Sequence, residues 1–167
     1  MSGSLAGRAV LVTRPSGLSD HLAELLRSQE CEVIILPAID ILPPDDPASL
    51  QAIIRRLDEF DIAIFVSPTA AVRACAVVAA ERGWPAGLRF AAIGNGTARA
   101  ARAAGIAAVI APEGRGDSDA LAAMPAFSEV ERKSIVIFRG QNGRESLRET
   151  LEARGARVEY AQCYKRA

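Results

Sequence analysis

The sequence contains few of the residues that most often carry acid–base, metal or redox chemistry. Its single histidine, His21, lies between polar neighbours in "SDHLAELL". The three cysteines are far apart, and none has a histidine at the spacing of a metal site. We therefore expect His21 on a helix surface and no metal or histidine-based catalysis. Free cysteine is usually buried, so we expect reduced, buried thiols at Cys31, Cys75 and Cys163.

A net charge and long apolar runs are also missing. The 20 basic residues balance the 20 acidic residues, so no overall field attracts nucleic acid or an anionic membrane. No stretch has the length of a charge-free membrane span, and the N-terminal segment offers no long secretory core. The sequence predicts a cytoplasmic protein with no nucleic-acid and no membrane partner, in which any anion binding is local.

Half of the residues are apolar, and they alternate between strand-like and helix-like runs. A short β-branched run at 8–15 precedes leucines at helical spacing (Leu18, Leu22, Leu25 and Leu26), and a second apolar run follows at 32–42. Such alternation predicts an α/β class with parallel strands and right-handed crossovers. The later expected elements are helix 50–60, strand 61–67, helix 68–83, strand 89–94, helix 97–105, strand 106–112, helix 117–127 with an Asp or Ser N-cap, and strand, glycine loop, helix and closing strand over 134–167.

A linker signal separates the opening strand–helix–strand unit from the rest. The segment "PPDDP" at 43–47 contains three prolines and two aspartates, which favour turns and extended backbone. We therefore expect a domain boundary near it.

Four loops share a composition that suits anions. They are "TRPSGLS" (13–19), "VSPTA" (66–70), "GNGTA" (94–98) and "RGQNGRES" (139–146). Each combines small residues and hydroxyls at or near an expected helix start, where backbone N–H groups are free. One such loop is usually a capped helix, but four together indicate anion binding at the carboxyl ends of the strands.

The familiar phosphate motifs are not present. Arg99 stands where a dinucleotide fingerprint beginning at Gly94 and Gly96 requires a third glycine, and no acidic residue closes the strand expected at 106–112. No Walker A loop occurs. The acidic residues of 58–61 precede a strand rather than follow one, so they are expected as solvated helix-end charges.

The order and spacing of several segments resemble uroporphyrinogen-III synthases over essentially the whole chain. They are "VLVTRP", "VSPTA", "AIGNGTARA", "DSDALAAMP" and "IFRGQNGRESLRETLEARGARVEYAQCYKR". The resemblance implies a cyclising hydro-lyase of haem biosynthesis that uses no metal and no organic cofactor. Enzymes of this family convert the linear tetrapyrrole hydroxymethylbilane to uroporphyrinogen III, with loss of water, inversion of the terminal ring and closure of the macrocycle.

The resemblance also implies two α/β domains joined by a two-stranded linker, with parallel sheets flanked by helices. On that pattern, 1–42 is part of a discontinuous first domain, 43–48 is a linker, 49–160 is the second domain and 161–167 begins a returning strand. The family pattern continues past Ala167, so we expect a C-terminally truncated chain with an incomplete first domain and little or no activity. Its unpaired sheet edge predicts self-association or poor order of the first segment.

The resemblance places carboxylate-binding groups in the loops, because the substrate carries acetate and propionate arms on every ring. Backbone N–H groups and hydroxyls bind such arms without a strongly basic surface. The expected substrate-binding residues are Thr13, Arg14, Ser67, Asn95, Gly96, Thr97, Ala98, Ser118, Arg139, Gly140, Asn142 and Gly143.

Tyr164 aligns with the tyrosine that the family places at the cleft. A phenol with an ordinary pKa near about 10 stays protonated at neutral pH, so Tyr164 is the expected acid for the leaving hydroxyl. Tyr160 is an even number of residues away and is expected on the same strand face. Two other functions stay open: a non-catalytic effector-binding module of the same fold, and an unrelated flavodoxin-like nucleotide-binding domain.

Overall fold

The computed structural model describes residues 5–15, 17, 19–114 and 116–167. Leu18, one of the leucines of the first expected helix, lies outside the described residues. The chain divides into two compact units. The first contains the chain up to Leu42 together with Arg166–Ala167, and the second contains Pro43–Lys165. The family's discontinuous two-domain organisation stays a prediction for this chain.

The first unit is a small parallel strand–helix–strand motif. Strand β1 (Ala9–Val12) pairs in parallel with β2 (Glu32–Ile35), and helix α1 (Asp20–Arg27) connects them and packs against β2. The buried apolar residues of this unit, among those described, are Val12, Ala23 and Cys31. Leu11 and Ile34, which face each other across the ladder, are about half exposed, at 53% and 48%. This unit therefore leaves one apolar sheet face uncovered.

The strand expected over 32–42 is shorter than predicted. It ends at Ile35, and a separate two-residue strand β3 (Ile41–Leu42) follows. Pro37 lacks the N–H that a continuing ladder requires, which explains the interruption. Still within the first unit, Asp40 exchanges two backbone hydrogen bonds with Ala167, of 2.9 and 3.1 Å.

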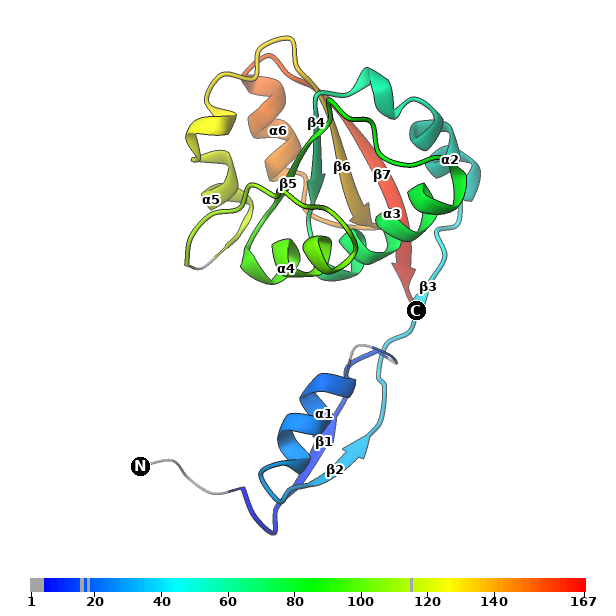
Figure 1. Ribbon diagram of the computed structural model, residues 1–167, viewed down its shortest axis with the longest axis vertical. Helices are drawn as coiled ribbons and strands as arrows, with labels where there is room; N and C mark the ends of the chain where they lie inside the picture. The colour runs from blue at the N-terminus through cyan, green and yellow to red at the C-terminus, as the bar shows by residue number, and fades with distance from the viewer. Residues whose placement is uncertain (1–4, 16, 18, 115) are drawn as a thin grey trace. The chain divides into compact units, whose positions relative to one another are not determined.

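A parallel sheet forms the centre of the second unit. Within this unit the strand order is β7-β6-β4-β5, and β4 pairs in parallel with both β5 and β6, while β6 pairs in parallel with β7. In Figure 1 the arrows of β4, β6 and β7 point the same way, so their carboxyl ends share one edge. The elements of this unit are α2 (Pro47–Arg55), the 3₁₀ helix η1 (Leu57–Glu59), β4 (Ile62–Phe65), α3 (Pro68–Glu81), β5 (Arg89–Ala92), α4 (Asn95–Ala103), α5 (Ser118–Ala122), the 3₁₀ helix η2 (Pro125–Phe127), β6 (Ser134–Gly140), α6 (Ser146–Ala153) and β7 (Arg157–Arg166), whose last residue is counted with the first unit.

Each face of this sheet has its own core. Ile62, Ile64 and Ile137 are buried on one face with Leu121 of α5 and Leu151 of α6. The alternate residues of β4 and β6 point to the other face, where the rings of Phe65, Phe90, Phe138 and Trp84 pack with centroids 5.0 to 6.2 Å apart. Because helices cover both faces, the strands read as continuous apolar runs.

The prediction of a strand over 106–112 was wrong. This segment makes a single isolated bridge, in which Ile110 pairs with Ala91 of β5. The alanines at 107 and 108 have low strand propensity, and Pro112 cannot donate to a ladder, so the segment does not extend the sheet. The helix expected over 117–127 is also interrupted, because Pro125 starts a separate 3₁₀ turn.

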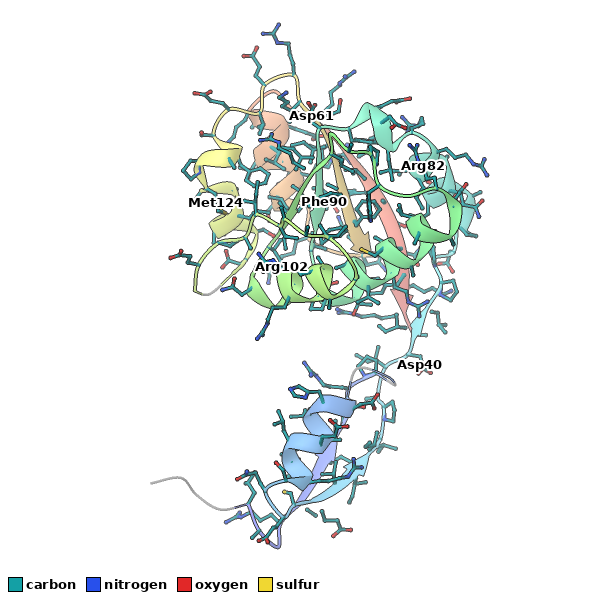
Figure 2. The ribbon with its side chains drawn as sticks, viewed as in Figure 1. Asp40, Asp61, Arg82, Phe90, Arg102 and Met124 are labelled. Atoms are coloured by element: carbon teal, nitrogen blue, oxygen red, sulfur yellow. The ribbon has the colours of Figure 1, made fainter. Side chains whose placement is uncertain are left out.

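The acidic residue at the start of β4 lies at the amino edge of the sheet, away from the carboxyl edge. Figure 2 labels Asp61 there, and its carboxylate accepts from the Ser134 N–H at 2.8 Å and from Lys133 Nζ at 3.0 Å. The Ser134 N–H, more than Lys133, holds the pKa of Asp61 below its usual value. Asp61 therefore ties β4 to β6. No helix of the described chain is long and apolar enough to cross a membrane.

Candidate functional site at the carboxyl edge of the sheet

The carboxyl edge of the second sheet gathers the loops that follow three parallel strands. The chain leaves β4 after Phe65, β5 after Ala92 and β6 after Gly140, and each loop leads directly into a helix (Figure 1). Strand β7 passes Gly140 at Tyr164. The topology therefore brings the loops at 66–70, 93–98 and 139–146 to the edge where ligands bind in parallel sheets.

Ser67 and Tyr164 meet at this edge. Ser67 is the N-cap of α3, and its Oγ accepts from the Ala70 N–H at 3.0 Å. The same Oγ lies 3.2 Å from the Tyr164 hydroxyl, in hydrogen-bond geometry. Tyr164 is 4% exposed, so its ring is fixed in the packed interior. The cap thus joins a helix N-terminus, where partial positive charge collects, to a buried phenol.

Gly140 leaves the space that the Tyr164 ring fills. A Cβ at position 140 would come within 2.7 Å of two ring carbons of Tyr164. The β6–β7 register also shifts between Arg139 and Gly140, where Arg139 pairs with Gln162 but Gly140 pairs with Tyr164. Glycine is therefore required at this position for close approach, and not for an unusual backbone angle.

The expectation that Tyr160 and Tyr164 share a strand face was wrong. Alternation of side chains holds only while the ladder is regular, and the register shift inserts one extra residue between them. Tyr160 stacks under the Arg139 guanidinium, at 4.2 Å, while Tyr164 contacts Ser67 and Gly140. The two phenols therefore have separate environments.

The loop after β5 starts α4 without a side-chain cap. Gly94 is the N-cap, Asn95 and Gly96 are exposed, and Thr97 and Ala98 are buried. The Ala98 N–H donates to the Gly94 carbonyl at 3.0 Å, inside the helix. The N–H groups of the first turn before it have no acceptor within a helix. Asn95, Gly96 and Thr97 therefore offer the backbone donors of this loop.

A close glycine contact holds the start of α5 against the start of α4. A Cβ on Gly116 would lie 2.3 Å from both the Gly94 Cα and the Ile93 carbonyl oxygen. Asp117 then caps α5 by accepting from the Ala120 N–H at 2.9 Å, which confirms the expected N-cap. Ser118, the first residue of α5, is partly buried beside this contact. The sequence analysis did not single out Gly116, because the contact joins residues far apart in the chain.

Arg139 lies inside the third loop, with 4% of its surface exposed. Its Nη1 donates to Glu145 Oε1 at 2.8 Å and to the Arg144 carbonyl at 3.3 Å, and its Nε donates to the Gly140 carbonyl at 3.2 Å. Asn142 in this loop has a positive φ of 58°, which asparagine tolerates better than most residues. Glu145 was not expected at the site, because no sequence pattern marks its hydrogen bond with Arg139.

The Tyr160 hydroxyl is buried and has no hydrogen-bond partner among the described residues. Burial, and after it the neighbouring Glu145 carboxylate, raise the pKa of Tyr160 to about 12. The Tyr160 hydroxyl and then the Arg139 guanidinium lower the pKa of Glu145. Because no hydrogen bond of good geometry joins Tyr160 to Glu145, we regard the two as electrostatic neighbours.

Thr13 and Arg14, expected as substrate-binding residues, belong to the first unit and follow β1 directly. Both are exposed, and the Thr13 carbonyl accepts from the Ala38 N–H at 3.2 Å. Their role in binding stays a prediction. Across the described part of the chain, no three His, Cys, Asp or Glu residues gather in a way that could hold a metal ion.

The chain matches a protein-family model and several curated proteins. The family described as Uroporphyrinogen-III synthase HemD matches residues 20–167. The uroporphyrinogen-III synthases of Salmonella typhimurium and Escherichia coli are 33% and 31% identical over 159 residues. These matches cover 95% of this chain but 65% of each relative. The chain thus spans slightly less than two thirds of the length of these two relatives.

Solved structures share the fold. Two crystal structures of uroporphyrinogen III synthase from Thermus thermophilus match 95% of this chain, with TM-scores of 0.64 and 0.56. Their sequences are 18% and 21% identical to this one, and the match covers 62% and 61% of those chains. At this level of identity the likeness concerns the fold.

Proposed function

Since the chain belongs to the uroporphyrinogen-III synthase family, we propose that it takes part in the dehydrating cyclisation of hydroxymethylbilane to uroporphyrinogen III. The observation that carries the proposal is the Ser67–Tyr164 contact, because it places a buried phenol against a helix N-terminus at the carboxyl edge. The substrate is a small linear tetrapyrrole with many carboxylates. The reaction requires an acid, anion-binding groups and control of the folding of the substrate.

Backbone amides are the proposed carboxylate-binding groups. Asn95, Gly96 and Thr97 offer first-turn N–H groups of α4, and Gly140, Asn142 and Gly143 form the loop beside Tyr164. Amides at helix starts bind carboxylates through hydrogen bonds and the helix dipole. This arrangement suits a chain whose net charge is zero. The substrate roles of Thr13, Arg14, Ala98 and Ser118 are kept as predictions.

Tyr164 is the proposed acid. Ser67 Oγ already accepts from Ala70 N–H, and its own proton is free to be donated to the Tyr164 oxygen. In that orientation the phenol proton is available to the hydroxyl group that leaves the substrate. The phenolate that remains accepts from the Ser67 hydroxyl near the positive end of α3, which stabilises its charge.

The proposed chemistry conserves atoms and charge. The phenol proton joins the leaving hydroxyl, the carbon–oxygen bond breaks, water departs and a delocalised cation remains on the bilane. The terminal pyrrole then attacks through its substituted carbon, and the resulting spiro intermediate rearranges to the inverted, closed macrocycle. A pyrrole proton is finally lost, and the phenolate is the group that can accept it. Most of the rate gain is expected from holding the two ends of the bilane together.

The test is a coupled assay with freshly generated hydroxymethylbilane that separates the type III product from the type I product. The type I product forms spontaneously, so the expected result is type III product in proportion to the amount of this chain. Only type I product, together with tight binding of the bilane, would favour an effector-binding module. Only type I product and no bilane binding would contradict both functions. The absence of a cofactor and a cytoplasmic location are also kept as predictions.

A further inference from the structure

Arg139 is a buried cation whose side-chain hydrogen bonds, among the described residues, all go to its own loop. Its guanidinium spans the turn from Gly140 to Glu145 through two carbonyl oxygens and one carboxylate, at 2.8 to 3.3 Å. Burying a charge is costly unless its donors are paired, and here the Nε and Nη1 donors are paired with the loop itself. The loop therefore folds around the guanidinium.

Two further contacts fix the plane of the guanidinium. The Tyr160 ring centroid lies 4.2 Å from the Arg139 Cζ, a distance at which an aromatic face attracts a cation. A Cβ on Gly143 would lie 2.4 Å from Arg139 Nη2, so the backbone at 143 lies directly against the guanidinium. A side chain at 143 would force either the guanidinium or the loop to shift.

Glu145 completes the arrangement from the start of α6. It occupies the N-cap position, yet its side chain makes no capping hydrogen bond and binds Arg139 instead. Its side chain is 53% exposed, while that of Arg139 is 5% exposed. The loop also reaches β7, because the Gln141 N–H donates to the Tyr164 carbonyl at 2.9 Å.

We propose that Arg139 and Glu145 are positioning residues that set the shape of the loop at 140–146 and that Arg139 does not itself bind the substrate. The role given to the loop rests on the proposed function, because its amides are proposed to receive a substrate carboxylate. The arrangement keeps Gly140 against the Tyr164 ring and keeps the Gln141 N–H on the Tyr164 carbonyl, while Asn142 and Gly143 stay exposed. This role differs from the substrate contact that the sequence analysis expected for Arg139.

Amide hydrogen exchange on this chain tests the positioning role without any assay of activity. Glu145→Gln removes the carboxylate charge and keeps Arg139, and Arg139→Lys keeps a charge but removes the planar set of donors. We expect exchange at Gln141, whose N–H donates to the Tyr164 carbonyl, to become about tenfold faster in both variants, in line with the loss of a charged hydrogen bond that holds the loop. Exchange at Ile137, in the core of β6, is expected to stay unchanged.

Glu149→Gln is the matched control. It makes the same charge change in the first turn of the same helix, at an exposed residue, and is expected to leave loop exchange as in the unaltered chain. Loop exchange that is unchanged in both Glu145→Gln and Arg139→Lys would overturn the proposal. If Arg139→Lys does not fold, the exchange result for Glu145→Gln alone decides the test.

Kinetics with hydroxymethylbilane separate positioning from direct binding. Positioning predicts a kcat about tenfold lower in both variants, with KM changed less than threefold. If Arg139 bound a substrate carboxylate in competition with Glu145, Glu145→Gln would lower KM and Arg139→Lys would raise it, which would overturn the proposal. A chain with no synthase activity contradicts the proposed function, and the exchange result then decides the positioning role alone.

Discussion

Ser67 is a single side chain with two partners, and its effects on stability and on activity can be separated. Its Oγ caps α3 and contacts Tyr164. Loss of a cap costs about 1 kcal/mol of stability, whereas loss of the Tyr164 contact acts on the proposed proton transfer. The two effects need a control that loses a cap elsewhere.

Tyr164→Phe is expected to lower kcat about a hundredfold, the scale of one lost general acid. Ser67→Ala is expected to lower kcat about tenfold as well as stability, since it frees the phenol from its partner. Steady-state assays of type III product check both values. Asp46→Ala is the matched control, because it removes the cap of α2 and touches no site residue. Unchanged kcat in Tyr164→Phe would remove Tyr164 from the acid role.

The raised pKa of Tyr160 predicts how the stability of the chain depends on pH. Its folded-state pKa of about 12 lies above the ordinary value of 10.0, so the folded chain holds this proton when the unfolded chain has lost it. The contribution of Tyr160 to the free energy of unfolding is therefore fully present below pH 10 and is lost as the pH rises from 10 to 12. Tyr160→Phe is expected to remove that part of the decline and to change stability little at pH 7, because the hydroxyl has no partner among the described residues. Denaturant unfolding from pH 7 to 12 checks this; an equal decline in both proteins would contradict it.

At the scale of elements, the start of α5 depends on a glycine pair. Gly116→Ala places a methyl group 2.3 Å from the Gly94 Cα and the Ile93 carbonyl, and backbone atoms cannot swing aside. We expect a loss of about 1 to 3 kcal/mol in stability, typical of an overpacked position. Denaturant unfolding measures it. Gly87→Ala, where no atom lies within 4 Å of the added carbon, is the control and is expected to be near neutral.

Local sequence patterns predicted most of the helices and strands and the loops that form the candidate site. Ser67 before Pro68 indicated a helix start, and Asp117 indicated another, because caps and first-turn prolines act over three or four residues. Strands such as β4 and β6 were clear because both of their faces are buried.

What the sequence did not predict depends on contacts between distant residues. The 106–112 segment has a strand-like composition, but whether it pairs is decided by the neighbouring edge, and it forms one bridge at Ile110. The register shift at Gly140 changes the face of Tyr164, and no local pattern marks it. The Arg139–Glu145 pair was missed although it is local in the chain, because Arg139 was expected to bind the substrate and Glu145 was given no role.

For the whole molecule, the uncovered sheet face of the first unit predicts self-association. Leu11, Ile34 and Leu36 are 53%, 48% and 59% exposed, and exposed apolar groups of this kind favour association. We expect light scattering after size-exclusion chromatography to give a mass above 17.7 kDa that rises with concentration. The double change Leu11→Lys and Ile34→Lys is expected to shift the chain toward that monomer mass. A monomer at all concentrations before any substitution would contradict the prediction.

The aromatic residues belong entirely to the second unit. The sole tryptophan, Trp84, packs edge-on against Phe65, Phe90 and Phe138, and both tyrosines lie on β7. The first unit, as divided above, contains no tryptophan, tyrosine or phenylalanine. Intrinsic fluorescence and near-ultraviolet circular dichroism therefore report on the second unit alone. A melting curve followed at those wavelengths does not detect whether β1, α1 and β2 have already unfolded.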